Sequence, residues 1–279
     1  MYDGFGIFES PDMKQWNLVG NIQIDDMKEC PDMFRLKHGS VKKWILMATE
    51  GKYVIGDFDG KQFKIESDVK RFAYGNTYAS QTWNDNNEEK KYIIFRLGDM
   101  SEQSKDISQM SLTMELALEK YQFGDEYYLS CKPIEKYNEI IHHELKKIRD
   151  EYVSYEEINL NLNPNLNLNF NNAHTPIFMI IMTIRNIVRK SIIETANGNI
   201  EYDHQKSELK YKNIYTKIDP CPNNEDHVNL KIIFDTNSIE IYNNDNIYIG
   251  YGTNGNQNDK ITLINLDIEE FVIYVPDQS

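Results

Sequence analysis

The chain has 279 residues, of which 40% are hydrophobic and 27% are charged, a balance that supports a sizeable core and argues against a wholly disordered protein. Asp and Glu total 44 against 30 Lys and Arg, which gives a formal net charge of −14. Nucleic acid or an anionic membrane would require a basic face, so the charge argues against both as partners.

The sequence offers no pattern for a metal site, a cofactor site or a targeting segment. Cys30, Cys131 and Cys221 are odd in number and far apart, which indicates neither a disulfide framework nor a zinc cluster. The longest apolar run, Ile177–Met182, is far shorter than a bilayer span. Tyr2–Phe8 is typical of a strand and lacks the charged and apolar regions of a signal peptide. We therefore expect no metal, no cofactor and no membrane partner, and a cytoplasmic chain as it stands.

Residues 1–135 consist of short apolar stretches separated by Gly, Asp and Asn turns. This spacing predicts an all-β propeller, sandwich or barrel. The expected strands are Phe5–Phe8, Lys43–Met47, Lys52–Gly56, Gln62–Ile65, Tyr78–Trp83, Lys91–Leu97, Ser111–Leu118 and Tyr127–Cys131.

A helix is expected next, followed by a second β-rich region. Apolar residues recur at helical spacing over Ile134–Tyr152, which predicts a linker helix over residues 136–153. Residues 159–172 alternate Asn with Leu or Phe around Pro164, which fits either an edge strand or a low-complexity insertion. Further strands are expected between residues 177 and 275, so the domains predicted are 1–135 and 154–279.

The segment Glu29–Asp32, Glu-Cys-Pro-Asp, is the first candidate site. From spacing alone, a structural turn is the simpler interpretation. However, these residues and the two apolar residues after them resemble the acid/base motif of glycoside hydrolase family 32, the β-fructosidases. The resemblance implies that Glu29 is the acid/base and that Cys30 modulates it.

Five further stretches resemble motifs of the same family in the same order. They are spread along nearly the whole chain, with no match between about residues 140 and 225. They are Gly6–Trp16, Tyr53–Gly60, Tyr74–Trp83, Met110–Ile134 in two parts (Met110–Leu116 and Lys132–Ile134), and Ile233–Tyr242.

The resemblance implies a fold and a set of sugar contacts. The expected fold is all-β: a partial five-bladed β-propeller, comprising the end of blade 2 and blades 3–5, followed by a C-terminal β-sandwich. Tyr78, Gln81 and Asp32 are the implied substrate contacts, although Tyr78 and Gln81 are also well explained as core or cross-strand residues. The implied partner is a fructose-containing oligosaccharide or polysaccharide.

Two family motifs do not occur in these 279 residues. One is the Trp-Met/Ile-Asn-Asp-Pro-Asn-Gly string that carries the nucleophile, and the other is the Arg-Asp-Pro string. A retaining glycosidase needs a nucleophilic carboxylate about 5 Å from its acid/base. The chain also has Arg96 where the family often has Trp, which would alter sugar stacking.

Two hypotheses follow for the function. In the first, the chain belongs to a β-fructofuranosidase that cleaves sucrose, inulin or levan, is inactive alone, and has a partner chain carrying the missing blades. In the second, it is a non-catalytic fructan-binding or interaction remnant. Many members of the family are secreted, so the resemblance leaves the location open.

Overall fold

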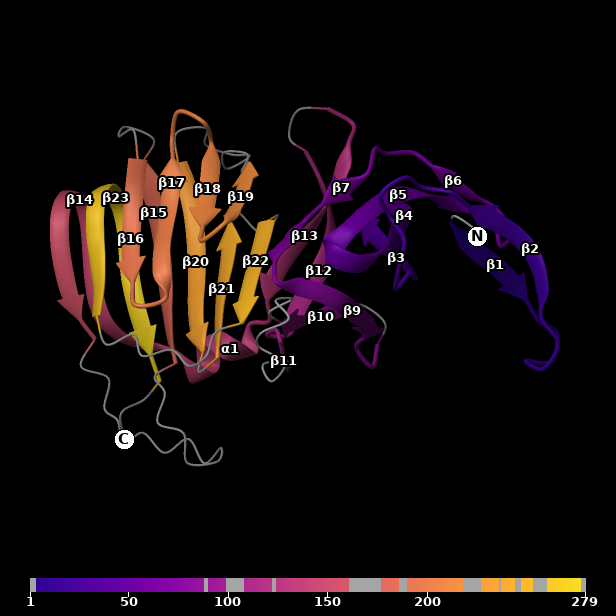
Figure 1. The fold of residues 1–279 in the computed structure, drawn as a ribbon, viewed down its shortest axis with the longest axis horizontal. Helices are drawn as coiled ribbons and strands as arrows, with labels where there is room; N and C mark the ends of the chain where they lie inside the picture. The colour runs from indigo at the N-terminus through magenta and orange to yellow at the C-terminus, as the bar shows by residue number, and fades with distance from the viewer. Residues whose placement is uncertain are drawn as a thin grey trace.

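A computed structural model of the protein describes residues 4–87, 90–98, 108–121, 124–160, 177–185, 190–217, 227–235, 237–243, 247–252 and 260–276. These residues form one hairpin, two small sheets and one large sheet, with a single short α-helix among them. The prediction of an all-β fold is confirmed. Figure 1 shows the hairpin β1–β2 at one end of an elongated molecule and β14 at the other.

The N-terminal hairpin pairs β1 (Phe5–Glu9) with β2 (Asn17–Ile22) in an antiparallel ladder. Its turn is fixed by Asp12, whose Oδ1 accepts hydrogen bonds of 2.9 Å from the backbone N–H groups of Lys14 and Gln15. These bonds lower the pKa of Asp12, because they favour the ionised carboxylate.

The first small sheet has five strands, two of which lie along the same edge of a third. The predicted pairing of Lys43–Met47 with Lys52–Gly56 is confirmed, with Trp44 opposite Gly56. Successive side chains point to opposite faces, so Ile45 and Leu46 lie in two different buried clusters. Residues 45–47 and 53–56 of this sheet are thus buried, with side chains on both faces. Its strands are β3 (Asp32–His38), β4 (Val41–Met47), β5 (Lys52–Phe58), β6 (Phe63–Ile65) and β7 (Lys70–Arg71), with the 3-10 turn η1 (Thr49–Gly51) between β4 and β5.

The second small sheet repeats this arrangement. β10 pairs with β9 along one edge and with both β11 and β12 along the other, and β12 pairs with β13. Ile93, Phe95 and Leu97 of β10 alternate into the core, each with no exposed surface. The strands are β9 (Thr77–Asn84), β10 (Lys91–Gly98), β11 (Ser108–Met110), β12 (Met114–Lys120) and β13 (Tyr127–Pro133).

The division of the first part of the chain into propeller blades stays a prediction. The described residues between 5 and 133 form a hairpin and two five-stranded sheets, apart from β8 (Ala73–Gly75), which joins the large sheet. In each of these sheets, two short strands share one edge of a longer strand: β6 and β7 both pair with β5, and β11 and β12 both pair with β10.

The large sheet has eleven strands, in the order β19-β18-β17-β16-β23-β15-β20-β21-β22-β8, with β14 also paired to β23. Side chains from β16–β18 and from β15 and β20 meet in one buried cluster, so the two halves of the sheet enclose a common core. Its strands are β8 (Ala73–Gly75), β14 (His143–Asn159), β15 (Phe178–Arg185), β16 (Lys190–Thr195), β17 (Gly198–Asp203), β18 (Glu208–Tyr211), β19 (Ile214–Lys217), β20 (His227–Asp235), β21 (Ser238–Asn243), β22 (Ile247–Gly252) and β23 (Lys260–Val275).

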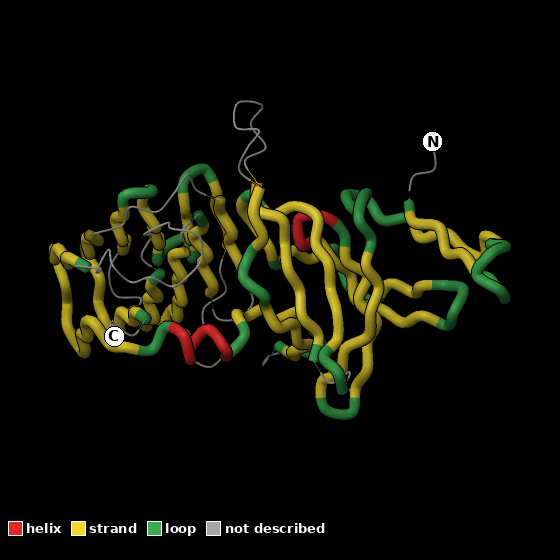
Figure 2. Tube along the Cα trace, turned by 90° about the horizontal axis from the view of Figure 1, so that it is seen from below, coloured by secondary structure: helices red, strands yellow, loops and turns green. Residues whose placement is uncertain are grey.

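The predicted linker helix over residues 136–153 is largely wrong. A helix forms only over α1 (Lys136–Ile140), where the chain crosses from β13 to β14 (Figure 2). From His143 onward the chain pairs with β23 along almost the full length of β14. The ladder hydrogen bonds and the burial of Ile148 and Val153 outweigh the helical spacing of apolar residues.

Two sequence expectations fall wholly or partly outside the described residues. Most of the Asn-rich segment 159–172 lies outside the described residues, because the described stretch ends at Leu160. Cys221 lies outside them as well. Among the residues that are described, no helix has the length and apolar character needed to span a membrane.

Candidate active site

Glu29 lies in the connection from β2 to β3, next to the start of β9. Its side chain is exposed, and its backbone carbonyl accepts a hydrogen bond of 3.1 Å from the Thr49 N–H in η1. The Tyr78 hydroxyl donates a hydrogen bond of 2.6 Å to Oε2 of Glu29. The structure therefore brings together two of the residues that the sequence singled out, across 49 positions of the chain.

A bulge in β9 sets the position of Tyr78. Tyr78 lies opposite Arg96 in the ladder and Ser80 lies opposite Phe95, so Ala79 is left over. Ala79 has a φ of +34°, which is unusual for a residue with a side chain. Bulges of this kind bend a strand and re-aim the neighbouring side chain, here toward Glu29.

The contact with Glu29 changes the pKa of Tyr78. The hydrogen bond to Glu29, together with its negative charge, raises the pKa of Tyr78 above its ordinary value, while the nearby Arg96 acts in the opposite direction. Tyr78 is therefore a protonated donor throughout the neutral range. Its hydroxyl lies on Oε2 of Glu29.

Cys30, the expected modulator, is an exposed free cysteine with a φ of +51°. This left-handed backbone conformation turns the chain sharply between Glu29 and the start of β3. Cys30 thus helps to place the preceding carboxyl through its backbone.

Asp32 is engaged with the protein itself. Its Oδ2 accepts a hydrogen bond of 2.7 Å from the Thr82 hydroxyl and one of 3.2 Å from the Thr82 N–H. These bonds tie the first residue of β3 to β9, in the neighbouring sheet. A sugar hydroxyl would have to compete with them for this oxygen.

Gln81 is exposed, and it bonds to the residue that follows it. Its side-chain amide donates a hydrogen bond of 3.1 Å to the backbone carbonyl of Thr82. The structure therefore separates the five expected site residues into the Glu29–Tyr78 pair, with Cys30 beside it, and two residues that bond to Thr82.

Thr82 and Ala79 are the residues that sequence reasoning missed. Both lie inside the motif Tyr74–Trp83, but a bulge leaves no signal in the residue types. The hydroxyl of Thr82 could have been suspected as a partner for Asp32 only if the adjacency of β3 and β9 were known.

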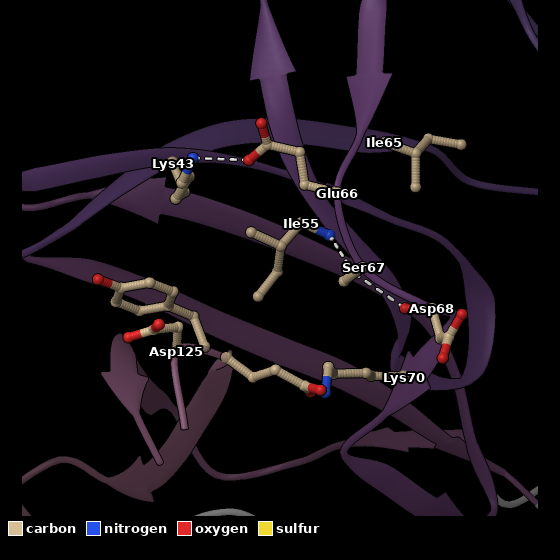
Figure 3. A pocket seen from close by; sticks show the side chains of 10 residues that line it. Lys43, Ile55, Ile65, Glu66, Ser67, Asp68, Lys70 and Asp125 are labelled. Atoms are coloured by element: carbon tan, nitrogen blue, oxygen red, sulfur yellow. Dashed lines mark hydrogen bonds and ion pairs between the residues drawn. The ribbon is translucent and has the colours of Figure 1, made fainter. Parts of the chain in front are cut away.

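A cleft lies away from these residues. It has a volume of about 600 Å³ and is bordered by the outer strands of the first small sheet and by the turn before β13 (Figure 3). Its charges are largely paired: Lys43 Nζ lies 2.6 Å from Glu66 Oε2, and Lys70 Nζ lies 2.9 Å from Glu126 Oε2. Within the described part of the chain, no group of three or more His, Cys, Asp or Glu side chains could hold a metal ion.

Comparison with known proteins gives a family for the first part of the chain. Residues 2–129 match the model described as "Glycosyl hydrolases family 32 N-terminal domain". A levanase from Bacillus subtilis is 31% identical over 101 residues, which cover 28% of this chain and 15% of that protein.

Solved structures match nearly the whole chain. An exo-inulinase from Aspergillus awamori superposes with a TM-score of 0.76 at 15% identity over 98% of this chain and 62% of that one. A fructofuranosidase variant from Schwanniomyces occidentalis, solved with fructosylnystose, gives a TM-score of 0.74 at 16% identity, over 98% and 65% of the two chains. These likenesses show the fold, and the chain spans less than two thirds of the length of these proteins.

Proposed function

Because this chain belongs to glycoside hydrolase family 32 through its residues 2–129, we propose that it carries the acid/base side of the active site of a retaining β-fructosidase. The substrates are terminal β-fructosides such as sucrose, inulin or levan. In this proposal, residues 1–135 are part of a propeller and residues 154–279 form a C-terminal sandwich. The observation that carries it is the 2.6 Å hydrogen bond from Tyr78 to Glu29, the acid/base candidate.

The chemistry assigns Glu29 two successive tasks. As an acid, Glu29 donates a proton to the oxygen that leaves with the rest of the substrate, while a second carboxylate attacks the anomeric carbon of fructose. As a base, it then takes a proton from the water that hydrolyses the fructosyl–enzyme bond. Tyr78 holds Oε2, so that Oε1 is the oxygen presented to the substrate.

The second carboxylate is supplied, in this proposal, by polypeptide outside these 279 residues. The family string that would carry this nucleophile does not occur in the sequence. The residues given therefore hydrolyse fructosides only when completed, by a longer chain or by a partner chain.

The N-terminal hairpin offers a surface for such a completing segment. Phe8 and Leu18 lie opposite each other in the ladder and are 55% and 54% exposed, and Trp16 beside them is 54% exposed. Within the described residues, β1 pairs with β2 alone, so its other edge can accept a further strand.

A second candidate function is a non-catalytic fructan-binding or interaction module. The exposure of the Glu29 side chain favours it, because a general acid works best in a partly desolvated pocket. The engagement of Asp32 and Gln81 with Thr82 leaves fewer groups for a sugar, but does not prevent weak binding at an open surface.

Complementation separates the two candidates. We expect the purified chain to hydrolyse sucrose and inulin no faster than buffer. Co-expression with the N-terminal blades of an active relative should then restore fructoside hydrolysis in the assembled complex, verified by size-exclusion chromatography. An assembled complex without activity supports the binding module, and robust turnover by the chain alone contradicts the proposal.

A further inference from the structure

Glu240 is a completely buried carboxyl at the contact between the large sheet and the second small sheet. It lies on β21, with no exposed surface. The backbone N–H of Leu112 donates a hydrogen bond of 2.8 Å to its Oε1. The hydroxyls of Tyr242 and Tyr248 each donate one of 2.9 Å to its Oε2. One carboxyl thus joins the segment before β12 to two strands of the large sheet.

The surroundings of Glu240 contain acids and neutral donors. Besides burial, the charge of Asp235 on β20 raises the pKa of Glu240, and Cys131 on β13 raises the pKa of Tyr242 and Tyr248. No Lys, Arg or His side chain of the described residues forms an ion pair with it. Burial raises the pKa of Glu240 to about 7, against the lowering effect of its hydrogen-bond donors.

The segment held by Glu240 is also bound to β10. Ser111 donates its N–H to the carbonyl of Phe95 at 2.8 Å, and its hydroxyl accepts from the Phe95 N–H at 2.9 Å. Gln109, just before it, donates its side-chain amide to the carbonyl of Asn237. The segment Gln109–Leu112 is therefore a bridge, with β10 on one side and the large sheet on the other.

We propose that Glu240 is a proton-sensitive latch, which holds the second small sheet against the large sheet when its carboxyl is neutral and weakens that contact when it ionises. A neutral carboxyl keeps its bond from Leu112 and can donate to Tyr248, whose hydroxyl lies within hydrogen-bonding reach of Ser111. The ionised form is a buried charge without a cation, which is costly even with four donors, the fourth being the Ser238 hydroxyl at 3.5 Å from Oε1.

The sign of the pH dependence follows from the raised pKa. The docked state binds a proton more tightly than the open state, in which Glu240 titrates near its ordinary value of 4.5. The contact is therefore strongest below pH 4.5 as far as this group is concerned, and weakens as the pH rises through about 7. Linkage between these two values makes the equilibrium constant for opening rise about tenfold between pH 6 and pH 8.

Hydrogen exchange of the whole chain tests the latch. We would follow peptides covering residues 108–118 and 238–243 by mass spectrometry from pH 6 to pH 8, after correction for the intrinsic exchange rate. The wild type should lose protection by about tenfold over this range. Glu240→Gln, a neutral side chain of the same shape, should keep the pH 6 protection and lose the pH dependence.

Glu240→Ala provides the matched control. It removes the acceptor of the hydrogen bonds from the Leu112 N–H and from the surrounding hydroxyls, so protection of both peptides should fall at every pH. Equal pH dependence in the wild type and Glu240→Gln would overturn the proposal. So would a Glu240→Gln protein as weakly protected at pH 6 as Glu240→Ala.

Discussion

At the scale of single residues, two side-chain contacts join β3 and its preceding loop to β9. Tyr78 donates to Glu29, and Asp32 accepts two hydrogen bonds from Thr82. Asp32 and Thr82 are partly buried, whereas Glu29 is exposed. The Asp32 contact is therefore the one that we expect to stabilise the pairing of the two sheets, and the Glu29 contact is the one on the surface, where we propose the chemistry.

Asp32→Ala should lower the free energy of unfolding by about 1–3 kcal/mol. The substitution removes the carboxylate that accepts a hydrogen bond from the Thr82 N–H. A partly buried donor that is left without a partner destabilises the folded state by about this amount. Asp25→Ala removes an exposed carboxyl from the same connection and should change the free energy by less than about 0.5 kcal/mol. Urea unfolding of both variants measures the difference, and equal stabilities would show that the Asp32 contact contributes nothing.

The candidate site could be predicted in part from the sequence. Glu29 and Tyr78 were both named, because they lie in motifs that resemble those of a known family. That Asp32 and Gln81 bond to the protein could not be foreseen, since this depends on which strands are neighbours. The bulge at Ala79 is equally hidden, because any residue type can be left over in a ladder.

At the scale of elements, the contact of β8 with β22 is set by two glycines. Gly75 has a φ of +91°, and a Cβ there would lie 2.1 Å from the carbonyl oxygen of Gly250. The two strands pair in parallel, which brings a segment of the first half of the chain into the large sheet. A side chain at residue 75 would push them apart.

Gly75→Ala should therefore destabilise the protein more than Gly60→Ala, by about 1–3 kcal/mol. Gly60 has a similar φ of +102° but open space around it, so that variant carries the backbone strain alone. Thermal unfolding of the two variants compares them directly. A melting temperature for Gly75→Ala equal to that of Gly60→Ala would mean that β8 can shift away from β22 without loss of stability.

The elements also show where local pattern and tertiary structure compete. The hairpin of β4 and β5 was predicted because its strands and turn are adjacent in the sequence. The strand β14 was expected to be a helix, because its partner β23 begins about 100 residues later and adds hydrogen bonds that local spacing does not reveal.

At the scale of the whole molecule, the hairpin β1–β2 carries more exposed apolar surface than its size would suggest. Phe8, Trp16 and Leu18 are each more than half exposed, and Phe8 and Leu18 pack over Gly6. Exposed apolar patches of this kind promote association in solution. We therefore expect the isolated chain to dimerise or aggregate.

Replacing Phe8, Trp16 and Leu18 together by Ser should shift the chain toward monomer. A matched control replaces Tyr152 and Tyr155 on β14, which are 55% and 61% exposed, by Ser. Analytical ultracentrifugation at several concentrations measures both variants. If the hairpin variant associates as strongly as the control, or the wild type is a monodisperse monomer, this surface does not drive association.

The most direct test of the account is the leaving-group dependence of Glu29→Gln in the complemented enzyme. We would compare the rate of hydrolysis of sucrose with that of an aryl fructoside whose leaving group needs little protonation. With sucrose, Glu29→Gln should lose about 10²–10⁴-fold in rate, because acid/base assistance of that size is removed, while the initial fructosylation by the aryl fructoside should suffer much less. Equal losses for both substrates, or activity indifferent to Glu29, would contradict the assignment of Glu29 as the acid/base.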